Sequence, residues 1–305
     1  MTADRLLAGV KRRIVIPASQ SLLLDADILA MADDEIKASM VPLLTAARQD
    51  YFVTSVNVAT VADQESYAVP YRAVGRGLRD LKIVDSAGLV RDVGLVTIED
   101  AHRAIDSASV SGFFFKGDSV VLVPAPADAL SSIQFWYELP PSRLVTVASA
   151  ALVTAIASGV ITCTSVPSTM TSGVAVDFVK GRSGNATVGL DVTLTGAASP
   201  TLTVDSSDVP TTLVVGDYVA LAGESPVIQL PDECYPLLES RLAKRILITN
   251  GDFDGARALD DAIKDEDKNL RLLLEPRIQG EPKIIINRDG LLRGRRGVGR
   301  RGLFS

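Results

Sequence analysis

The spacing of apolar residues changes twice along the chain, and this change most restricts the folds that the chain can adopt. Over residues 24–52 apolar side chains recur at steps close to three and four, which places them on one face of a helix. Over residues 53–227 short runs rich in β-branched and aromatic residues alternate with Gly, Asp and Ser, as in antiparallel strands joined by turns. The helical spacing returns after residue 230. We therefore predict an α+β fold whose helices come from both ends of the sequence.

Proline residues and leucine repeats define the expected helices. Pro42 lacks a backbone donor and crowds the preceding turn, so we predict two helical segments that meet near Met40. After residue 230, Leu238, Leu242 and Ile246 repeat at four. A second helical stretch carries apolar side chains at Ala256, Leu259, Ile263, Leu270, Leu273 and Leu274. We predict that both stretches pack on the N-terminal helices as a helical-bundle core, and that the run "PKIIIN" at residues 282–287 forms a strand.

The β-patterned part of the sequence divides into two textures. Residues 53–139 have turn sequences at 85–88 and 115–119, which predicts an antiparallel β-meander with a short helix over 98–105. Residues 140–228 are rich in Thr, Val and Ser and hold few charges. Within them "VGLDVTLTG" alternates strictly, which places Val188, Leu190, Val192 and Leu194 on one face of a strand. We predict an inserted all-β module, a sandwich or a barrel. The expected divisions are 1–139, 140–228, 229–287 and an extended C-terminal tail, 288–305.

Few residues in this sequence can supply catalytic chemistry. His102 is the only histidine, so a triad built on a histidine base has a single candidate and no His/Cys cluster has zinc-ligand spacing. We expect His102 at the surface, and Cys163 and Cys234 as buried reduced thiols. No run of eighteen residues is apolar enough for a membrane span. These observations predict a protein that is not an enzyme, needs no cofactor and has no membrane partner.

Two motifs match functional patterns by letter, and in both cases we favour a structural interpretation. "GVGRRG" at 297–302 fits a dinucleotide fingerprint, but only three residues follow it in this sequence and no helix is expected to receive a pyrophosphate. "NGDFDGARALDD" at 250–261 resembles a calcium loop, yet its twelfth position is Asp261 and its eighth is Arg257. We predict a tight helix connection with Asp254 as N-cap. Adjacent acids such as Asp33 and Asp34 are expected on solvated helix faces.

The tail "RDGLLRGRRGVGRRGLFS", residues 288–305, holds six arginines and one carboxylate in a chain of net charge −6. Six guanidinium groups can neutralise phosphates and release counterions, which is the nucleic-acid interpretation. The competing interpretation is an arm that lies in an acidic groove of a partner protein, with apolar side chains as anchors between the arginines. Because a nucleic-acid arm needs no apolar anchors, we favour protein docking and keep nucleic-acid binding as the alternative.

The C-terminal helical hairpin resembles the head-to-tail adaptor, or connector, proteins of short-tailed bacteriophages. The matching stretch is "LPDECYPLLESRLAKRILITNGDFDGARALDDAIKDEDKNLRLL", with the closest likeness at 230–234, 243–245 and 254–274. "DADILAMADDEIKASMVPLLTAARQDYF" is similar to the first helices of that family, and "VPYRAVGRGLRDLKIVD" to the β-region that follows them. The likeness covers about two thirds of the chain, in texture and order. The module at 140–228 departs from the minimal family pattern.

The resemblance implies a structural ring protein in the neck of the virion. Such adaptors assemble under the portal protein in about twelve copies, join it to a tail nozzle or tube protein, and let packaged double-stranded DNA pass without specific binding. Localisation would be the phage neck, and the host cytoplasm during assembly. By analogy we expect portal docking by a basic and apolar set in the tail: Arg293, Arg295, Arg296, Arg300, Arg301, Leu303 and Phe304. We expect a charge-patterned helix to form the contact between copies, through Asp260, Lys264, Asp267 and Lys268.

Overall fold

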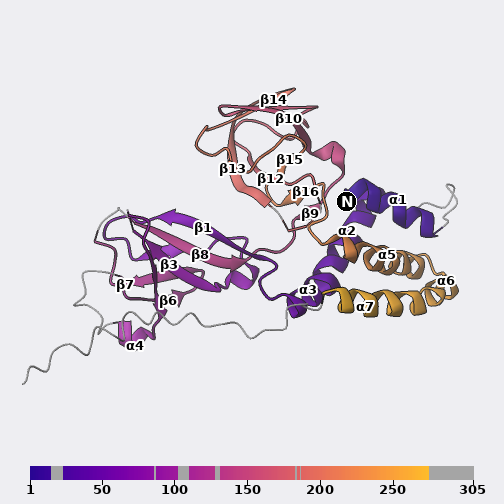
Figure 1. Cartoon of the computed structure of the whole chain (residues 1–305), viewed down its shortest axis with the longest axis horizontal. Coiled ribbons are helices and arrows are strands. Elements are labelled where there is room, and N and C mark those ends of the chain that lie inside the picture. Colours follow the sequence, from indigo (N-terminus) through magenta and orange to yellow (C-terminus); the bar gives the residue numbers. More distant parts are fainter. Residues whose placement is uncertain are drawn as a thin grey trace, which may run out of the picture. The chain divides into compact units, whose positions relative to one another are not determined.

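The computed structural model describes residues 1–14, 23–85, 87–101, 110–127, 131–182, 184–185 and 187–274. It confirms the α+β class: helices from both ends of the sequence accompany two antiparallel-rich sheets and a closed barrel (Figure 1). The tail at 288–305 and the expected strand at 282–287 lie outside the described residues. The expected domain divisions stay predictions.

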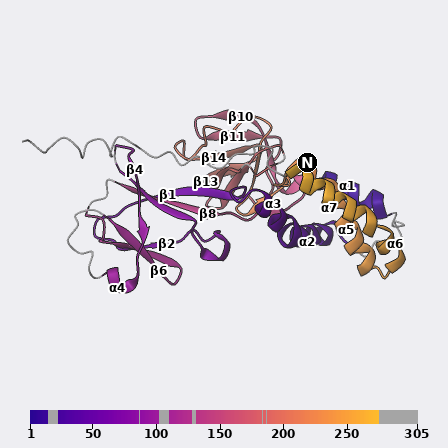
Figure 2. The same ribbon diagram turned by 60° about the horizontal axis from the view of Figure 1, so that its bottom comes forward.

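The helical region combines segments that are distant in sequence. Its members are α1 (Ala3–Ile14), α2 (Asp25–Glu35), α3 (Val41–Ala47), α5 (Tyr235–Thr249), α6 (Phe253–Ala258) and α7 (Asp260–Leu274). All of these except α6 contribute to one apolar cluster, which includes Leu6, Leu29, Met40, Leu44, Leu238, Leu242, Ile246 and Leu270. Figure 2 shows α5 and α7 side by side. The leucine repeat of α5 therefore buries the stripe that the sequence predicts.

The break expected near Met40 takes the form of a π-helical turn. The segment η2 (Ile36–Met40) is π-helical, and α3 starts directly after it with Pro42 in its first turn. Just before the proline, Val41 N–H donates to the Ile36 carbonyl, five residues earlier, so the helix is widened where Pro42 would crowd the preceding turn. The wider π-turn thus lets the chain continue past Pro42, and Ile36, Met40 and Leu44 all reach the same core.

Two details of the C-terminal helices differ from the prediction. Asp252, and not Asp254, is the N-cap of α6, and its side chain accepts a hydrogen bond from the Gly255 N–H at 2.8 Å. The expected apolar face of α7 buries Leu270 and Leu274, whereas Leu273 is exposed. Leu270 and Leu274 are one turn apart, while Leu273 follows Leu270 at a step of three and falls at the margin of the stripe.

The first β-region is a sandwich of two sheets, which we call the sandwich. One sheet has the order β1-β8-β3-β4 and the other β2-β7-β6-β5. Their bounds are β1 (Val53–Ala59), β2 (Ser66–Ala68), β3 (Asp80–Val84), β4 (Val90–Asp92), β5 (Gly94–Leu95), β6 (Gly112–Lys116), β7 (Ser119–Val123) and β8 (Ser132–Glu138). One apolar cluster receives side chains from both sheets, among them Tyr67, Leu81, Phe113, Leu122 and Phe135. The helix α4 (Ile98–Ala101) and the 3₁₀ turn η3 (Val74–Arg76) lie between strands in the sequence.

The order of the strands is not that of a simple meander. Turns join β3 to β4 and β6 to β7, as the sequence predicts, and the Asp85 carboxylate accepts hydrogen bonds from Ala87 N–H and Leu89 N–H in the first of them. However, β8 lies between β1 and β3, and β5 pairs with β6 in parallel. The pairings of β8 join strands that are far apart in sequence, which local patterns do not encode.

The inserted module is a closed six-stranded barrel with the order β10-β11-β14-β13-β12-β15. Its strands are β10 (Ala151–Ala157), β11 (Val160–Cys163), β12 (Ala175–Val179), β13 (Thr187–Ala198), β14 (Thr201–Val204) and β15 (Tyr218–Leu221). A short parallel pair, β9 (Arg143–Leu144) with β16 (Glu224–Ser225), flanks it, and the 3₁₀ turn η4 (Val147–Ser149) leads into β10.

After the barrel the chain returns to the helical region. Residues 226–228 lie beside the first residues of the chain, where Ala3 N–H donates to the Pro226 carbonyl at 2.8 Å. The 3₁₀ turn η5 (Asp232–Cys234) leads into α5.

A β-bulge interrupts the strict alternation that the sequence predicts for β13. The pairing with β12 shifts between Val176↔Val192 and Phe178↔Gly189, and Asp191 has a φ of 55°. Because the bulge changes the side-chain parity, Leu194 points into the barrel core while Leu190 packs against the core of the sandwich. The prediction that Val188, Leu190, Val192 and Leu194 share one face is therefore wrong for Leu190.

Candidate functional site

The expected portal-docking set, Arg293, Arg295, Arg296, Arg300, Arg301, Leu303 and Phe304, lies outside the described residues, and so does His102. The role of these side chains stays a prediction. The last described residue before this set in the sequence is Leu274, at the end of α7, and it is buried in the helical core. The described surface nearest in sequence carries Leu272 and Leu273, both exposed.

The structure divides the four residues expected at a ring contact into two pairs. Asp260 and Asp267 face α5: the Asp260 carboxylate lies 2.5 Å from Lys244 Nζ, and Asp267 lies 3.2 Å from an Arg241 guanidinium nitrogen. The hydrogen bond from Lys244 lowers the pKa of Asp260. These two carboxylates therefore hold α7 on α5 within one chain, which the sequence pattern does not reveal.

Lys264 and Lys268 instead lie on the exposed face of α7. Lys264 Nζ is 3.1 Å from Asp261 on the same helix, and the two side chains are 74% and 93% exposed. Asp265 and Lys268 are exposed as well. An exposed pair on one helix contributes little to stability, so these charges are free to meet charges on another surface.

A groove of about 370 Å³ runs over α5 between α2 and α7. Its floor carries the basic side chains Arg241, Lys244 and Arg245. Each has an acidic partner on a neighbouring helix: Glu35 lies 3.3 Å from Arg241, Asp34 lies 3.1 Å from Arg245, and Asp260 pairs with Lys244. The groove is a set of paired charges that fixes the register of three helices, with two apolar side chains, Ile248 and Ile263, at its wall.

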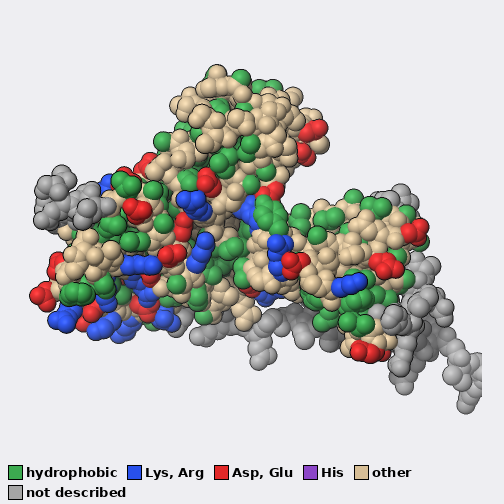
Figure 3. Space-filling view, turned by 180° about the vertical axis from the view of Figure 1, so that it is seen from behind, with side chains coloured by type: hydrophobic (Ala, Val, Ile, Leu, Met, Phe, Trp, Pro, Cys, Tyr) green, Lys and Arg blue, Asp and Glu red, His purple; other side chains and the backbone are tan. Residues whose placement is uncertain are grey.

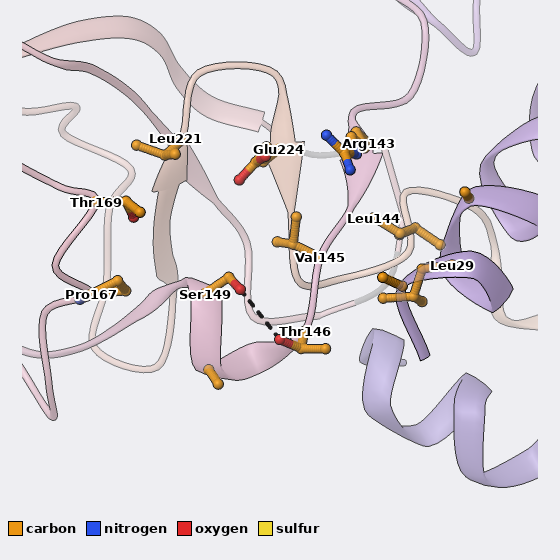
Figure 4. Close-up of a pocket in the computed structure, with 13 residues that line it drawn as sticks. Leu29, Arg143, Leu144, Val145, Thr146, Ser149, Pro167, Thr169, Leu221 and Glu224 are labelled. Atoms are coloured by element: carbon orange, nitrogen blue, oxygen red, sulfur yellow. Dashed lines mark hydrogen bonds between the residues drawn. The ribbon is translucent and has the colours of Figure 1, made fainter. Parts of the chain in front are cut away.

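A second cleft, of about 410 Å³, is lined by residues of α2, β9, η4, β15, β16 and the loop at 167–169 (Figure 4). Arg143 and Glu224 come from the paired strands β9 and β16, opposite each other in register. Neither forms an ion pair with a described residue. Thr146 and Ser149 hydroxyls lie 3.3 Å apart at the other side, and Leu29 and Leu144 supply an apolar wall.

A buried ion pair joins the barrel to the sandwich, and the sequence analysis missed it. Asp177 on β12 is fully buried and accepts two hydrogen bonds from Arg72 Nη1, at 2.8 and 2.9 Å. It also accepts 2.9 Å hydrogen bonds from the Asp191 and Gly223 N–H groups. Burial disfavours the Arg72 cation, but Asp177 more than offsets this and raises the pKa of the guanidinium. The lone carboxylate in the apolar run "VAVDFV" was the signal that could have identified the site.

Further contacts surround this pair. Tyr71 donates its hydroxyl to Asp191 at 2.6 Å, and burial together with that hydrogen bond raises the pKa of Tyr71 to about 12. Asn185, in the loop before β13, donates its side-chain amide to the Tyr51 carbonyl at 2.7 Å, just before β1. The barrel is therefore tied to the sandwich by polar contacts as well as by Leu190. We call the Arg72, Asp177 and Asp191 group the seam.

Asp33 corrects the expectation of a solvated helix face. It is only 8% exposed, and it accepts a hydrogen bond from Leu144 N–H at 2.9 Å. Burial raises the pKa of Asp33 to about 6 despite that hydrogen bond. Its neighbour Asp34 is exposed and pairs with Arg245. Asp33 thus fixes α2 to β9, at the entrance to the barrel.

The described residues hold no group of three or more His, Cys, Asp or Glu side chains that could bind a metal ion. Cys163 and Cys234 are free and buried, as expected, and burial raises the pKa of their thiols to about 11 and about 12. Thiols with such pKa values are poor nucleophiles. Among the described helices, none is both long and apolar enough to cross a membrane.

Charge is distributed unevenly over the surface. On the face that Figure 3 shows, Lys and Arg side chains gather over the helical region, while the surface of the barrel is largely uncharged.

In comparisons with known proteins, no family model matches the chain and no curated protein matches its sequence.

Proposed function

We propose that the chain is a structural head-to-tail adaptor of a bacteriophage virion, which joins the portal protein to the tail and lines the channel through which DNA passes. The proposal follows the resemblance of the helical hairpin and the first helices to that class. It includes a helical-bundle core, a location in the virion neck, and no enzymatic activity. We further propose a ring of about twelve copies, as the resemblance implies.

One observation supports this proposal: α7, the last described helix before the arginine-rich segment in the sequence, is held firmly on α5 by ion pairs. Leu270 and Leu274 anchor the last turns of α7 in the helical core. Asp260 and Asp267 fix the same helix laterally on α5. A segment that joins two large assemblies must be anchored to a rigid part of its own subunit. We propose that α7 is this part.

The exposed face of α7 is our candidate for the contact between copies. Lys264 and Lys268 lie there with Asp261 and Asp265. A closed ring requires two unlike surfaces on each subunit, because each copy meets its neighbours head to tail. The acidic net charge of −6 suits a channel wall that DNA must pass without binding.

Reconstitution with purified portal protein tests the proposal. We expect the full chain to form ring complexes visible by negative-stain microscopy, and a chain that ends at Asn287 to lose them. Lys264→Glu with Lys268→Glu should reduce ring formation while leaving the fold intact. Lys116→Glu, an exposed charge reversal on β6 of the sandwich, is the matched control. If the full chain forms no complex with the portal, or if the shortened chain binds as well, the proposal is wrong.

Nucleic-acid binding is the outcome to separate from this one. A gel-shift titration with duplex DNA at physiological salt compares the full chain with the chain that ends at Asn287. Tail-dependent retardation of the DNA, together with no portal complex, would establish the nucleic-acid alternative. No retardation by either chain is the result that an adaptor predicts.

A further inference from the structure

Edge strands of the sandwich differ in how they are protected. The edge strands β2 and β4 are three residues long and β5 has two, and β4 carries the charged side chains Arg91 and Asp92. Short length and charge are the usual means by which a sheet edge avoids pairing with other chains. The fourth edge, β1, has seven residues, Val53–Ala59, and no charge, glycine or proline. It is the edge that lacks these devices.

The register shows which backbone groups of β1 point away from the sheet. Thr60 N–H donates to the Ser131 carbonyl, and Leu139 N–H donates to the Phe52 carbonyl. In an antiparallel ladder the hydrogen-bonded positions alternate, so the even-numbered residues of β1 bond to β8. Ser55, Asn57 and Ala59 therefore direct their N–H and carbonyl groups outward. None of these groups has a hydrogen-bond partner in another described segment.

The apolar core of the sandwich is also incompletely covered along this edge. Val56 stands opposite Phe135 in register, on the face that points into the core. Phe135 is fully buried, yet Val56 is 37% exposed. A further strand beside β1 would place its own side chains next to Val56 and Val58 and would remove this apolar surface from water.

The chain itself contains a segment whose sequence suits this edge. Thirty-one residues, 275–305, follow the last described residue. They contain the run "PKIIIN" at 282–287, which has three consecutive β-branched residues and alternates so that Ile284 and Ile286 share one face. Two isoleucines on that face match the two valines that β1 presents at the core.

We propose that residues 282–287 of a neighbouring copy add to β1 as an extra strand of this sheet. The inference rests on the proposed ring, because a strand given by one copy and an edge offered by the next are two unlike surfaces of the kind that head-to-tail closure needs, in addition to the exposed face of α7. Backbone hydrogen bonds from Ser55, Asn57 and Ala59 supply affinity, and Ile284 and Ile286 supply the side-chain match.

Cysteine cross-linking between two differently labelled chains tests the pairing. One full-length chain carries Ser55→Cys and the other Ile285→Cys, both on the face away from the core. The native thiols, Cys163 and Cys234, react slowly because they are buried with raised pKa values. We expect a cross-linked product that contains one chain of each kind after mixing. Lys116→Cys, at an exposed position on β6 of the sandwich, replaces Ser55→Cys as the control for random collisions.

A proline substitution then removes a single outward donor. Adding Asn57→Pro to the Ser55→Cys chain should lower the yield of the mixed product about tenfold, whereas Asn57→Ala, which keeps the N–H group, should preserve it. Circular dichroism establishes that both variants fold. The inference would be overturned by equal yields for the two variants, or by a mixed product no more abundant than that of the Lys116→Cys control.

The same samples separate this inference from the proposed function. If portal complexes form while the mixed cross-link is absent, the strand pairing is wrong and the adaptor proposal stands. If the cross-link forms but no portal complex does, the pairing stands as a contact between copies and the adaptor proposal fails.

Discussion

The barrel and the sandwich are both built from antiparallel strands around an apolar core, but only the barrel closes. In the barrel every strand has a neighbour on each side, whereas the sandwich leaves four edges and shortens three of them. The strands of both regions are rich in valine, although only those of the barrel are also rich in threonine. The comparison teaches that the availability of backbone groups follows from topology and cannot be judged from composition.

The seam joins the barrel to the sandwich, so a change there is the most sensitive test of whether the two regions unfold independently. Asp177→Ala would remove the closest partner of the nearly buried Arg72 cation, which would keep only the longer 3.4 Å contact with Asp191, and would leave two N–H groups unpaired. We expect a loss of about 3–5 kcal/mol in the free energy of unfolding. Trp136, the only tryptophan, lies on β8 of the sandwich, so its fluorescence during denaturant unfolding reports whether a change in the barrel destabilises the other region.

The double variant Arg72→Met with Asp177→Ala provides the control, since it leaves no unpaired buried charge. It should be less destabilised than Asp177→Ala alone. A loss below about 1 kcal/mol for Asp177→Ala would mean that the two regions unfold independently of the seam.

The stability cost of a proline substitution can be compared between β15, which is paired on both sides in the barrel, and β1, the open edge of the sandwich. Ala222 N–H donates to the Ala175 carbonyl, so Ala220, two residues earlier, occupies a hydrogen-bonded position opposite Asp177. Ala220→Pro should therefore cost about 3 kcal/mol or more, while Asn57→Pro on β1 should cost less than about 1 kcal/mol. Thermal and urea unfolding of the two variants give the values. Similar costs at both positions would contradict the assignment of β1 as an open edge.

The pH at which these comparisons are made matters because of Asp33. Its pKa of about 6 in the folded chain lies above the ordinary value of 3.8, so the folded state binds this proton more tightly than the unfolded state does. The corresponding stabilisation is present at low pH and is lost as the pH rises from about 4 through 6, with an upper limit of about 3 kcal/mol.

Asp33→Asn keeps an oxygen that can accept the Leu144 hydrogen bond but cannot ionise. We expect it to raise stability at pH 7 by about 1–3 kcal/mol and to flatten the pH dependence between 4 and 6. Urea unfolding at several pH values measures this. An unchanged slope in the variant would show that another group is responsible, while Asp34→Asn, the exposed neighbour, should leave the slope unaltered.

Local patterns predicted the helices after residue 24 and after residue 230 because burial there follows the helical period, but they did not identify α1. The stripe formed by Leu238, Leu242 and Ile246 is buried as expected, and Pro42 marked the irregular turn. The same reasoning could not find β8 between β1 and β3, since that pairing depends on contacts across many residues. The closed barrel was one of two predicted alternatives, and its closure depends equally on distant pairings.

The candidate site was harder to predict for a related reason. Charge patterning placed Asp260, Lys264, Asp267 and Lys268 on one helix, but only packing shows that the two aspartates face α5. Asp33 and Asp177 were missed as buried groups, because the partner of each lies on a segment brought close by the fold. A carboxylate inside an apolar run was the available signal for Asp177, and Asp33 offered none.

The bulge at Asp191 has a consequence for anyone who wishes to move the barrel to another protein. Since one extra residue turns Leu190 toward the sandwich, the excised barrel would carry an uncovered leucine and an unmatched aspartate at Asp177. Transplantation would therefore require resurfacing at these positions, or a recipient that offers an apolar hollow and an arginine of its own.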